Sequence, residues 1–86
     1  MTGASVPHST MVHAFIMVKT ATGKSEDLLG DVRALDVVEE AHIVAGDFDM
    51  IVEVEADEVY DVLHTASSEI QDFEGVSDTK TYIALE

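Results

Sequence analysis

Segments with strand-like and helix-like spacing of apolar residues follow one another along this chain in an order that few folds contain. Residues 12–19 form a short β-branched and aromatic run with two apolar faces, which predicts a strand covered on both sides. Residues 37–45 and 48–56 alternate between apolar and polar positions around a Gly-Asp break, which predicts a hairpin. Residues 76–85 alternate again and predict a closing strand.

Two segments between these strands repeat apolar residues at helical spacing. The first is expected to end near Leu35, with Thr22 as its N-cap. The second is expected to begin after Asp57 as N-cap, and Gly75 follows it as a residue suited to the left-handed conformation. The apolar stripe of the first comprises Leu28, Val32 and Leu35. The stripe of the second comprises Val59, Val62, Leu63, Ala66, Ile70 and Phe73.

The resulting order, βαββαβ, predicts an α+β ferredoxin-like sandwich of the dimeric α+β barrel type. It has a four-stranded antiparallel sheet with two helices on one face. Two helices leave the other face uncovered, and large apolar groups there mark an interface. We therefore predict an obligate dimer that packs sheet to sheet. Residues 11–86 are expected to form the domain, with residues 1–10 a flexible arm or an expression remnant and Met11 the natural start.

The net charge of the chain argues against two classes of binding partner, nucleic acids and anionic membranes. The chain carries 4 Lys+Arg and 18 Asp+Glu, a net charge of −14, so it lacks the cations that nucleic acids and anionic membranes require. A hydrophobic content of 47% argues for a packed core despite this charge. Acids spread along the whole chain are typical of proteins from salt-accumulating halophiles, and we predict a halophilic archaeal source. No signal or membrane-spanning pattern is present, so we expect a cytoplasmic protein.

Catalytic and metal sites are not indicated. The chain has no Cys, and its histidines (His8, His13, His42 and His64) show no short ligand spacing. His13 and His42 could meet on one sheet face if their strands were neighbours, but a structural role is the better interpretation. We therefore expect no enzyme activity, no cofactor, no metal and no catalytic residue.

The break at residues 44–49 is the most informative stretch. A Gly and two acids at a turn can be structural, with Asp49 capping the turn through its own backbone. They can equally form a ligand loop for an α-amino acid, whose carboxylate would bind turn amides and whose ammonium would bind Asp49. The spacing alone leaves both interpretations open.

Several stretches in order resemble the effector-binding (RAM) domain of the Lrp/AsnC family. Residues 14–24 are similar to its opening strand and helix, and residues 44–49 to its Gly-Asp-Tyr-Asp turn, with Phe48 replacing Tyr. Residues 73–83 resemble its Pro-Gly-Val-x-x-Thr-x-Thr closing strand, with Glu74 replacing Pro. The resemblance covers nearly all of residues 11–85.

This resemblance implies a feast/famine regulator domain that forms homodimers and, by their assembly, an octamer. It implies a small effector, commonly an amino acid, bound between dimers by Gly46, Asp47 and Asp49, with hydroxyls from Thr79 and Thr81. The irregular first ten residues cannot form a helix-turn-helix, so we expect a stand-alone domain that modulates transcription by assembling with full-length Lrp/AsnC regulators.

Proteins with two other functions share this topology, and both functions remain alternatives for this chain. One is a dimeric α+β barrel monooxygenase that uses the sheet-face cavity and recruits His13 or His42. The other is an ACT-type regulatory module appended to an enzyme.

Overall fold

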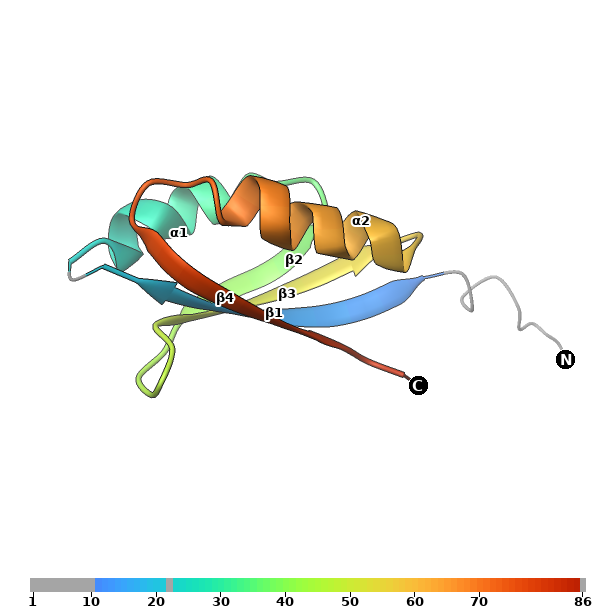
Figure 1. Ribbon diagram of the computed structural model, residues 1–86, viewed down its shortest axis with the longest axis horizontal. Helices are drawn as coiled ribbons and strands as arrows, with labels where there is room; N and C mark the ends of the chain where they lie inside the picture. The colour runs from blue at the N-terminus through green and yellow to red at the C-terminus, as the bar shows by residue number, and fades with distance from the viewer. Residues whose placement is uncertain (1–10, 22, 86) are drawn as a thin grey trace, which may run out of the picture.

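The computed structural model describes residues 11–21 and 23–85, apart from the side chain of Ser67, and shows one antiparallel sheet beneath two helices (Figure 1). The strands are β1 (Val12–Thr20), β2 (Val38–Ile43), β3 (Met50–Ala56) and β4 (Val76–Ile83). The helices are α1 (Ser25–Arg33) and α2 (Val59–His64), which continues as the π-helix η3 (Thr65–Ile70). The predicted βαββαβ ferredoxin-like fold is confirmed. The expected arm at 1–10 and the N-cap Thr22 lie outside the described residues.

The register of the sheet defines its two faces. The strand order is β2-β3-β1-β4, so β3 separates β1 from β2. Ile16 lies opposite Val52 on β3 and Thr81 on β4. Because opposite residues of an antiparallel pair project from the same face, this register assigns every strand position to one side.

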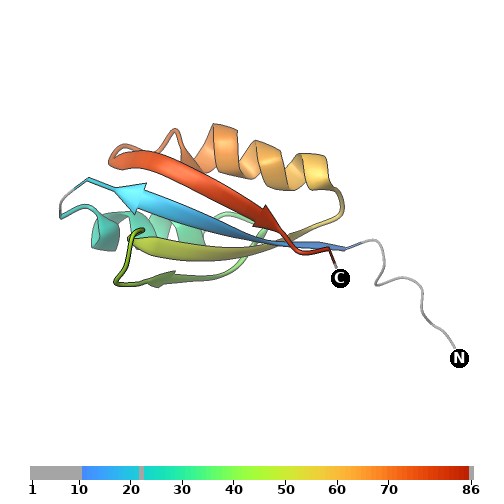
Figure 2. The same cartoon turned by 60° about the horizontal axis from the view of Figure 1, so that its bottom comes forward.

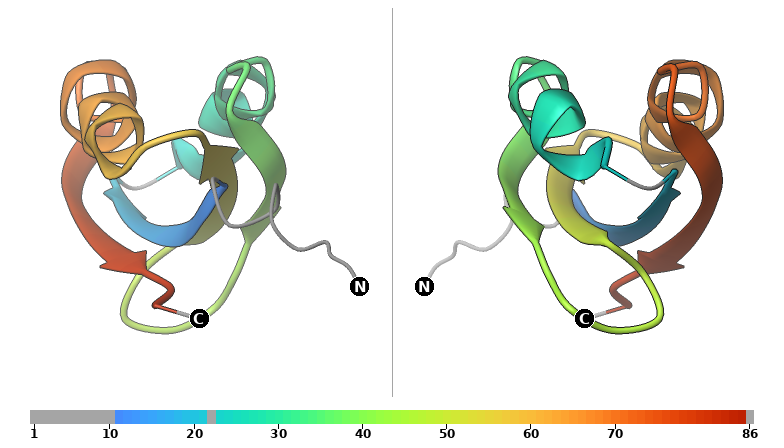
Figure 3. Two further views of the ribbon diagram at one scale, coloured as in Figure 1. Left: turned by 90° about the vertical axis from the view of Figure 1, so that its right-hand side faces the viewer. Right: turned by 90° about the vertical axis from the view of Figure 1, so that its left-hand side faces the viewer.

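The helix-covered face carries the core. Both helices lie on this side of the curved sheet (Figure 3). The central strands β1 and β3 contribute an unbroken set of buried side chains, and the helices close it with Leu28, Val32, Val62, Ala66 and Ile70. The strand members of the core are Ala14, Ile16, Val18, Ala41, Met50, Val52, Val54 and Ala56.

The opposite face, called the open face below, is not covered by any element of the described chain. Phe15 of β1 is 39% exposed and its cross-strand partner Tyr82 is 53% exposed. Met17 and Ile51 beside them are half-buried. The sequence predicts that β1 is covered on both sides. The helices of the described chain cover only one of them.

The apolar stripe of the second helix differs from the expected one. Val62, Ala66 and Ile70 are buried at steps of four residues, whereas Val59 and Leu63 are 45% and 47% exposed. The η3 segment has wider turns, since hydrogen bonds of a π-helix span five residues. Val62, Ala66 and Ile70 form the buried stripe, and Val59 and Leu63, which lie in α2 before η3, are outside it.

The ends of several elements also differ from expectation. α1 ends at Arg33 rather than near Leu35, because the chain tightens into a turn closed by the Leu35 amide on the Val32 carbonyl. Glu58, not Asp57, is the N-cap of α2, and it makes no side-chain capping bond. Gly75 has φ +100°, as its left-handed role predicts.

Within the part of the chain that the structure describes, no helix has the length and apolar character needed to cross a membrane.

Candidate functional site

The loop between β2 and β3, residues 44–49, bends away from the helices at one end of the open face (Figures 1 and 2). The amide of Val44 donates to the carbonyl of Asp49 at 2.9 Å, which closes the loop. The amide of Asp49 donates to the carbonyl of Val18 on β1, also at 2.9 Å. These bonds extend the ladder beyond the strand ends, so the base of the loop is held against β1.

The side chain of Asp49 ties the loop to the start of α1. Its Oδ2 accepts a hydrogen bond from the amide of Thr20 at 2.9 Å, in a half-buried position. The hydroxyl of Thr20 in turn lies 2.8 Å from that of Ser25, the first residue of α1. Asp49 thus contacts the backbone of β1 rather than its own turn. A carboxylate has about four acceptor sites, so this bond leaves capacity for a further donor.

Lys19 holds the tip of the loop. Its Nζ donates to the carbonyl of Asp47 at 2.8 Å and lies 6.0 Å from the centre of the Phe48 ring. The ring contact is within the range of a cation–π interaction. Sequence reasoning did not single out Lys19, although it is one of only four Lys and Arg residues in the chain.

A hollow of about 380 Å³ lies between this loop and the open face. Met17 and Ile51 contribute its floor from the sheet, and residues 44–48 its wall. Apolar groups dominate the lining, while Asp47 adds a carboxylate. The volume is that of a small-molecule site, which typically spans about 300–1,000 Å³.

Gly46 lines the hollow without being required by the backbone. Its φ lies outside the left-handed region, and a Cβ added there would meet nothing within 4 Å. The turn would therefore tolerate Ala at this position. A glycine that folding does not require leaves room for close approach of a ligand to the backbone.

Thr79 and Thr81 project toward the other face of the sheet. They lie opposite Val18 and Ile16, both of which are fully buried under the helices. β1 also separates β4 from β3 and the loop. The structure therefore brings Gly46 and Asp47 together at the hollow with Asp49 beside it, and places the two threonines elsewhere.

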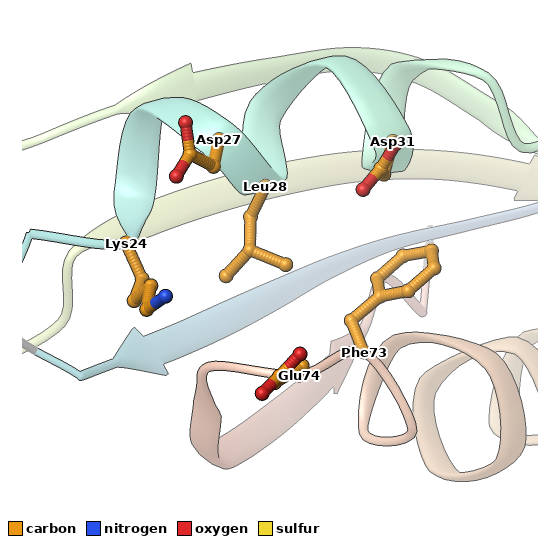
Figure 4. Close-up of a pocket in the computed structure, with 6 residues that line it drawn as sticks. All are labelled: Lys24, Asp27, Leu28, Asp31, Phe73 and Glu74. Atoms are coloured by element: carbon orange, nitrogen blue, oxygen red, sulfur yellow. The ribbon is translucent and has the colours of Figure 1, made fainter.

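A second hollow, of about 220 Å³, lies between α1 and the turn after η3 (Figure 4). Leu28 and Phe73 form its apolar base, and its rim carries Lys24 with three acidic residues, Asp27, Asp31 and Glu74. The sequence patterns did not indicate this hollow, because its two walls are brought together by the helix packing alone.

The histidines of the described chain are dispersed. His13 lies 2.8 Å from Glu53, and His42 lies 2.9 Å from Glu40. His64 stacks on Tyr60 at 6.2 Å on the far side of the molecule. The expectation that His13 and His42 could meet on neighbouring strands is wrong, because β3 lies between β1 and β2. Within residues 11–21 and 23–85, no group of three His, Asp or Glu is arranged to hold a metal ion.

The ferredoxin-like fold, the open sheet face and the hollow at its end define a small binding domain. The family model for the Lrp/AsnC ligand binding domain matches residues 13–86. Because this match covers most of the sequence, the chain belongs to the Lrp/AsnC ligand binding domain family.

Similar proteins agree with this assignment. The leucine-responsive regulatory protein of Haemophilus influenzae is 28% identical over 61 residues, which cover 71% of this chain and 37% of that protein. The crystal structure of FFRP-DM1 is 35% identical, with a TM-score of 0.81 over 86% of this chain and 99% of that chain. The chain thus spans a little over a third of the Haemophilus regulator and nearly the whole of FFRP-DM1.

The fold also recurs in a ligand complex. The transcriptional regulator NMB0573 of Neisseria meningitidis, solved with L-Met, has a TM-score of 0.81 at 21% identity. The match covers all of this chain and 58% of that chain.

Proposed function

We propose that this chain is a sensing and self-association domain of Lrp/AsnC type. It dimerises through its open face, binds an amino acid in the hollow beside residues 44–48, and modulates transcription through the regulators with which it assembles. One observation carries the proposal: Met17 and Ile51 belong both to the floor of the hollow and to the open face. A ligand in the hollow therefore touches the surface used for association.

The groups around the hollow suit an α-amino acid with an apolar side chain. The side chain would rest on Met17 and Ile51, and the ammonium would bind the carboxylate of Asp47 in the lining together with that of Asp49 next to the hollow. The amide of Gly46 and the Nζ of Lys19 would bind the carboxylate. The Neisseria regulator binds an amino acid of this kind, L-Met.

Thr79 and Thr81 would bind the effector at a position away from the hollow. Since they lie on the helix-covered side of an edge strand, their hydroxyls would contact an effector held between assembled copies. Association of dimers up to an octamer would create such a position.

We propose binding rather than catalysis. The similar Haemophilus protein is named a regulatory protein, and the hollow holds apolar side chains and a single carboxylate. Neither His13 nor His42 lines it. The monooxygenase alternative would require one of them at the substrate.

The test is the melting temperature of the purified protein with a panel of amino acids. A ligand at a hundredfold excess over its Kd stabilises the fold by about 2.7 kcal/mol, or on the order of 10 °C for a domain of this size. We expect such a shift with apolar amino acids. No shift with any amino acid, together with bound haem or oxygenase turnover, would favour the enzyme instead.

A pair of variants separates the two roles of Asp49. Asp49→Asn keeps an oxygen acceptor for the Thr20 amide but loses the charge, so it should retain basal stability and lose the ligand-induced shift. Asp49→Ala should lose both. Asp72→Asn removes the same charge at an exposed position outside the hollow and should behave as wild type. If Asp49→Asn still shows the full shift, Asp49 is not a ligand residue.

A further inference from the structure

One side of α2 carries an apolar patch that remains exposed in the described chain. Val59, Tyr60 and Leu63 are 45%, 71% and 47% exposed. Leu63 follows the other two by four and three residues, and side chains at these spacings are neighbours on a helix. Single exposed apolar residues are common on protein surfaces, whereas adjoining ones make a contiguous patch of the kind that marks an interaction site. These three residues are called the α2 patch below.

Tyr60 is the most exposed member of the α2 patch, and its ring is held in place. It stacks on the imidazole of His64, one turn later, with ring centres 6.2 Å apart and planes at 18°. A side chain that is already oriented loses little conformational freedom when a partner covers it. Tyrosine is also enriched among the residues that dominate the binding energy of protein interfaces. The patch therefore contains a preformed aromatic anchor.

The helix that carries the patch is acidic. Residues 34–79 include no Lys or Arg, so neither α2 nor η3 has a permanent positive charge. Asp57 and Glu58 come directly before the patch and Asp61 lies in the same helical turn, and all three are exposed. Glu69 and Asp72, toward the other end of the helix, are exposed as well. The α2 patch is thus an apolar surface on a helix whose other exposed charges are carboxylates.

We propose that the α2 patch docks an amphipathic helix of a partner protein. The apolar stripe of that helix would cover Tyr60 and Leu63, and its flanking Lys and Arg residues would pair with the surrounding acids. Apolar residues at helical spacing form ridges that fit the grooves of a second helix. Opposite charges around the contact then select the partner. This inference goes beyond the proposed sensing function and depends on neither the effector nor the dimer.

Other occupants suit the α2 patch less well. Two copies of α2 brought together would place Asp57, Glu58 and Asp61 of each copy near the same acids of the other, and the helix has no Lys or Arg to compensate them. An anionic membrane surface would repel these acids too. A basic amphipathic helix complements both the apolar and the charged groups.

Binding of a model helix tests the proposal. The probe is a fluorescein-labelled peptide of about 18 Leu and Lys residues with every Leu on one helical face, and its control has the same residues reordered so that no apolar face forms. Fluorescence anisotropy at about 0.15 M salt should show at least about tenfold tighter binding of the probe. Tyr60→Asp should raise the probe's dissociation constant at least about tenfold, and Tyr60→Phe should keep it within about twofold of wild type. Since Tyr60→Asp adds a negative charge, attraction by net charge alone would not weaken binding.

A matched pair of double variants tests the acids. Glu58→Gln with Asp61→Asn removes two charges at the start of α2 and should raise the probe's dissociation constant about threefold to tenfold. Glu26→Gln with Asp27→Asn removes two charges from the first turn of α1, at the opposite end of the molecule (Figures 1 and 2), and should change this constant less than about twofold. The side chain of Glu58 makes no capping bond, so circular dichroism should show a folded α2 variant.

Several results would overturn the proposal. A wild-type protein that binds the two peptides equally is attracting charge alone. A Tyr82→Asp variant, changed on the open face, that loses as much affinity as Tyr60→Asp moves the peptide to that face. Loss of self-association in Tyr60→Asp would make the α2 patch an interface between copies, and loss of sedimentation with phosphatidylcholine vesicles would make it a lipid contact. A preference for the amphipathic peptide that only the α2 substitutions weaken supports the proposal.

Discussion

The two faces of the same sheet are built from the same strands but have different compositions. On the helix-covered face Ile16, Val18 and Val52 are fully buried, and the described residues there leave no large side chain of the central strands exposed. On the open face Phe15 and Tyr82 are 39% and 53% exposed, and the positions level with them or two residues away along the strands include six charged or ionisable groups. These groups are His13, Glu40, Glu53, Glu55, Lys80 and His42.

This difference shows what each face does. A face whose central strands carry only apolar side chains toward the helices is closed by the chain's own helices and supplies the stability of the monomer. A face with an apolar centre and charged residues around it resembles an interface, in which an apolar core is surrounded by polar groups. Substitutions on the first face should therefore change folding, and substitutions on the second should change association.

The largest effect is expected on the covered face. Ile16→Ala removes a fully buried side chain between β3 and β4, and should lower the free energy of unfolding by about 2–5 kcal/mol. Met17→Ala, the next residue on the same strand, faces the other way and should cost less than half as much in the monomer. Urea denaturation of both variants measures the difference. Equal losses would mean that both faces are core.

The next effect concerns association. Phe15→Asp on the open face should raise the dimer dissociation constant at least about 100-fold, equivalent to about 2.7 kcal/mol, while the monomer stays folded. Tyr60→Asp makes a similar change at a residue that is 71% exposed on α2 and should leave the dimer intact. Sedimentation velocity distinguishes them. A Phe15→Asp protein that still dimerises would move the interface off this face.

Alanine substitutions at two glycines in turns, Gly75 and Gly46, should differ in their effect on stability. Gly75→Ala should destabilise by about 1–2 kcal/mol, because φ is +100° and the new Cβ would lie 3.1 Å from the Cβ of Lys24. Gly46→Ala, at the hollow, should change stability by less than about 0.5 kcal/mol, since its Cβ would meet nothing. Thermal melts give both values. A large loss for Gly46→Ala would show that the loop needs glycine for folding.

A small effect, at or below that of Gly75→Ala, is expected from salt. A net charge of −14 predicts self-repulsion that ions screen, with a Debye length of about 30 Å at 0.01 M and about 3 Å at 1 M. We expect about 1 kcal/mol of added stability between these concentrations, or roughly 4–8 °C in Tm. Equal melting temperatures at the two concentrations would contradict the halophile interpretation of the composition.

Local patterns predicted the fold because each element carries its own periodicity. The alternation in residues 48–56 placed Phe48, Met50, Val52 and Val54 on one face. The last three are buried together, whereas Phe48 lies in the loop before β3 and lines the hollow. The pattern failed where geometry departs from the ideal period. The buried stripe of the second helix excludes Val59 and Leu63, which the helical spacing had included, and no residue type in the stretch signals that the helix continues as the π-helix η3.

The candidate site was predicted in part. Residues 44–49 were identified from the Gly-Asp break and from the family resemblance, and they do form a loop beside a hollow. The partners of that loop were not predictable. Thr20 and Lys19 are about 30 residues earlier in the chain, and they reach Asp49 and Asp47 only because β1 pairs with β3.

The sequence by itself determined which residues share a face, because side chains of a strand alternate with a period of two whatever the strand packs against. It also determined the order of the elements and the excess of acid. Only the tertiary structure decided that the helices cover the face of Ile16 rather than that of Phe15. It also formed the hollow, because the residues that line it come from strands that are distant in the chain and close in the sheet. Contacts of that kind are set by pairing and packing, which no local pattern records.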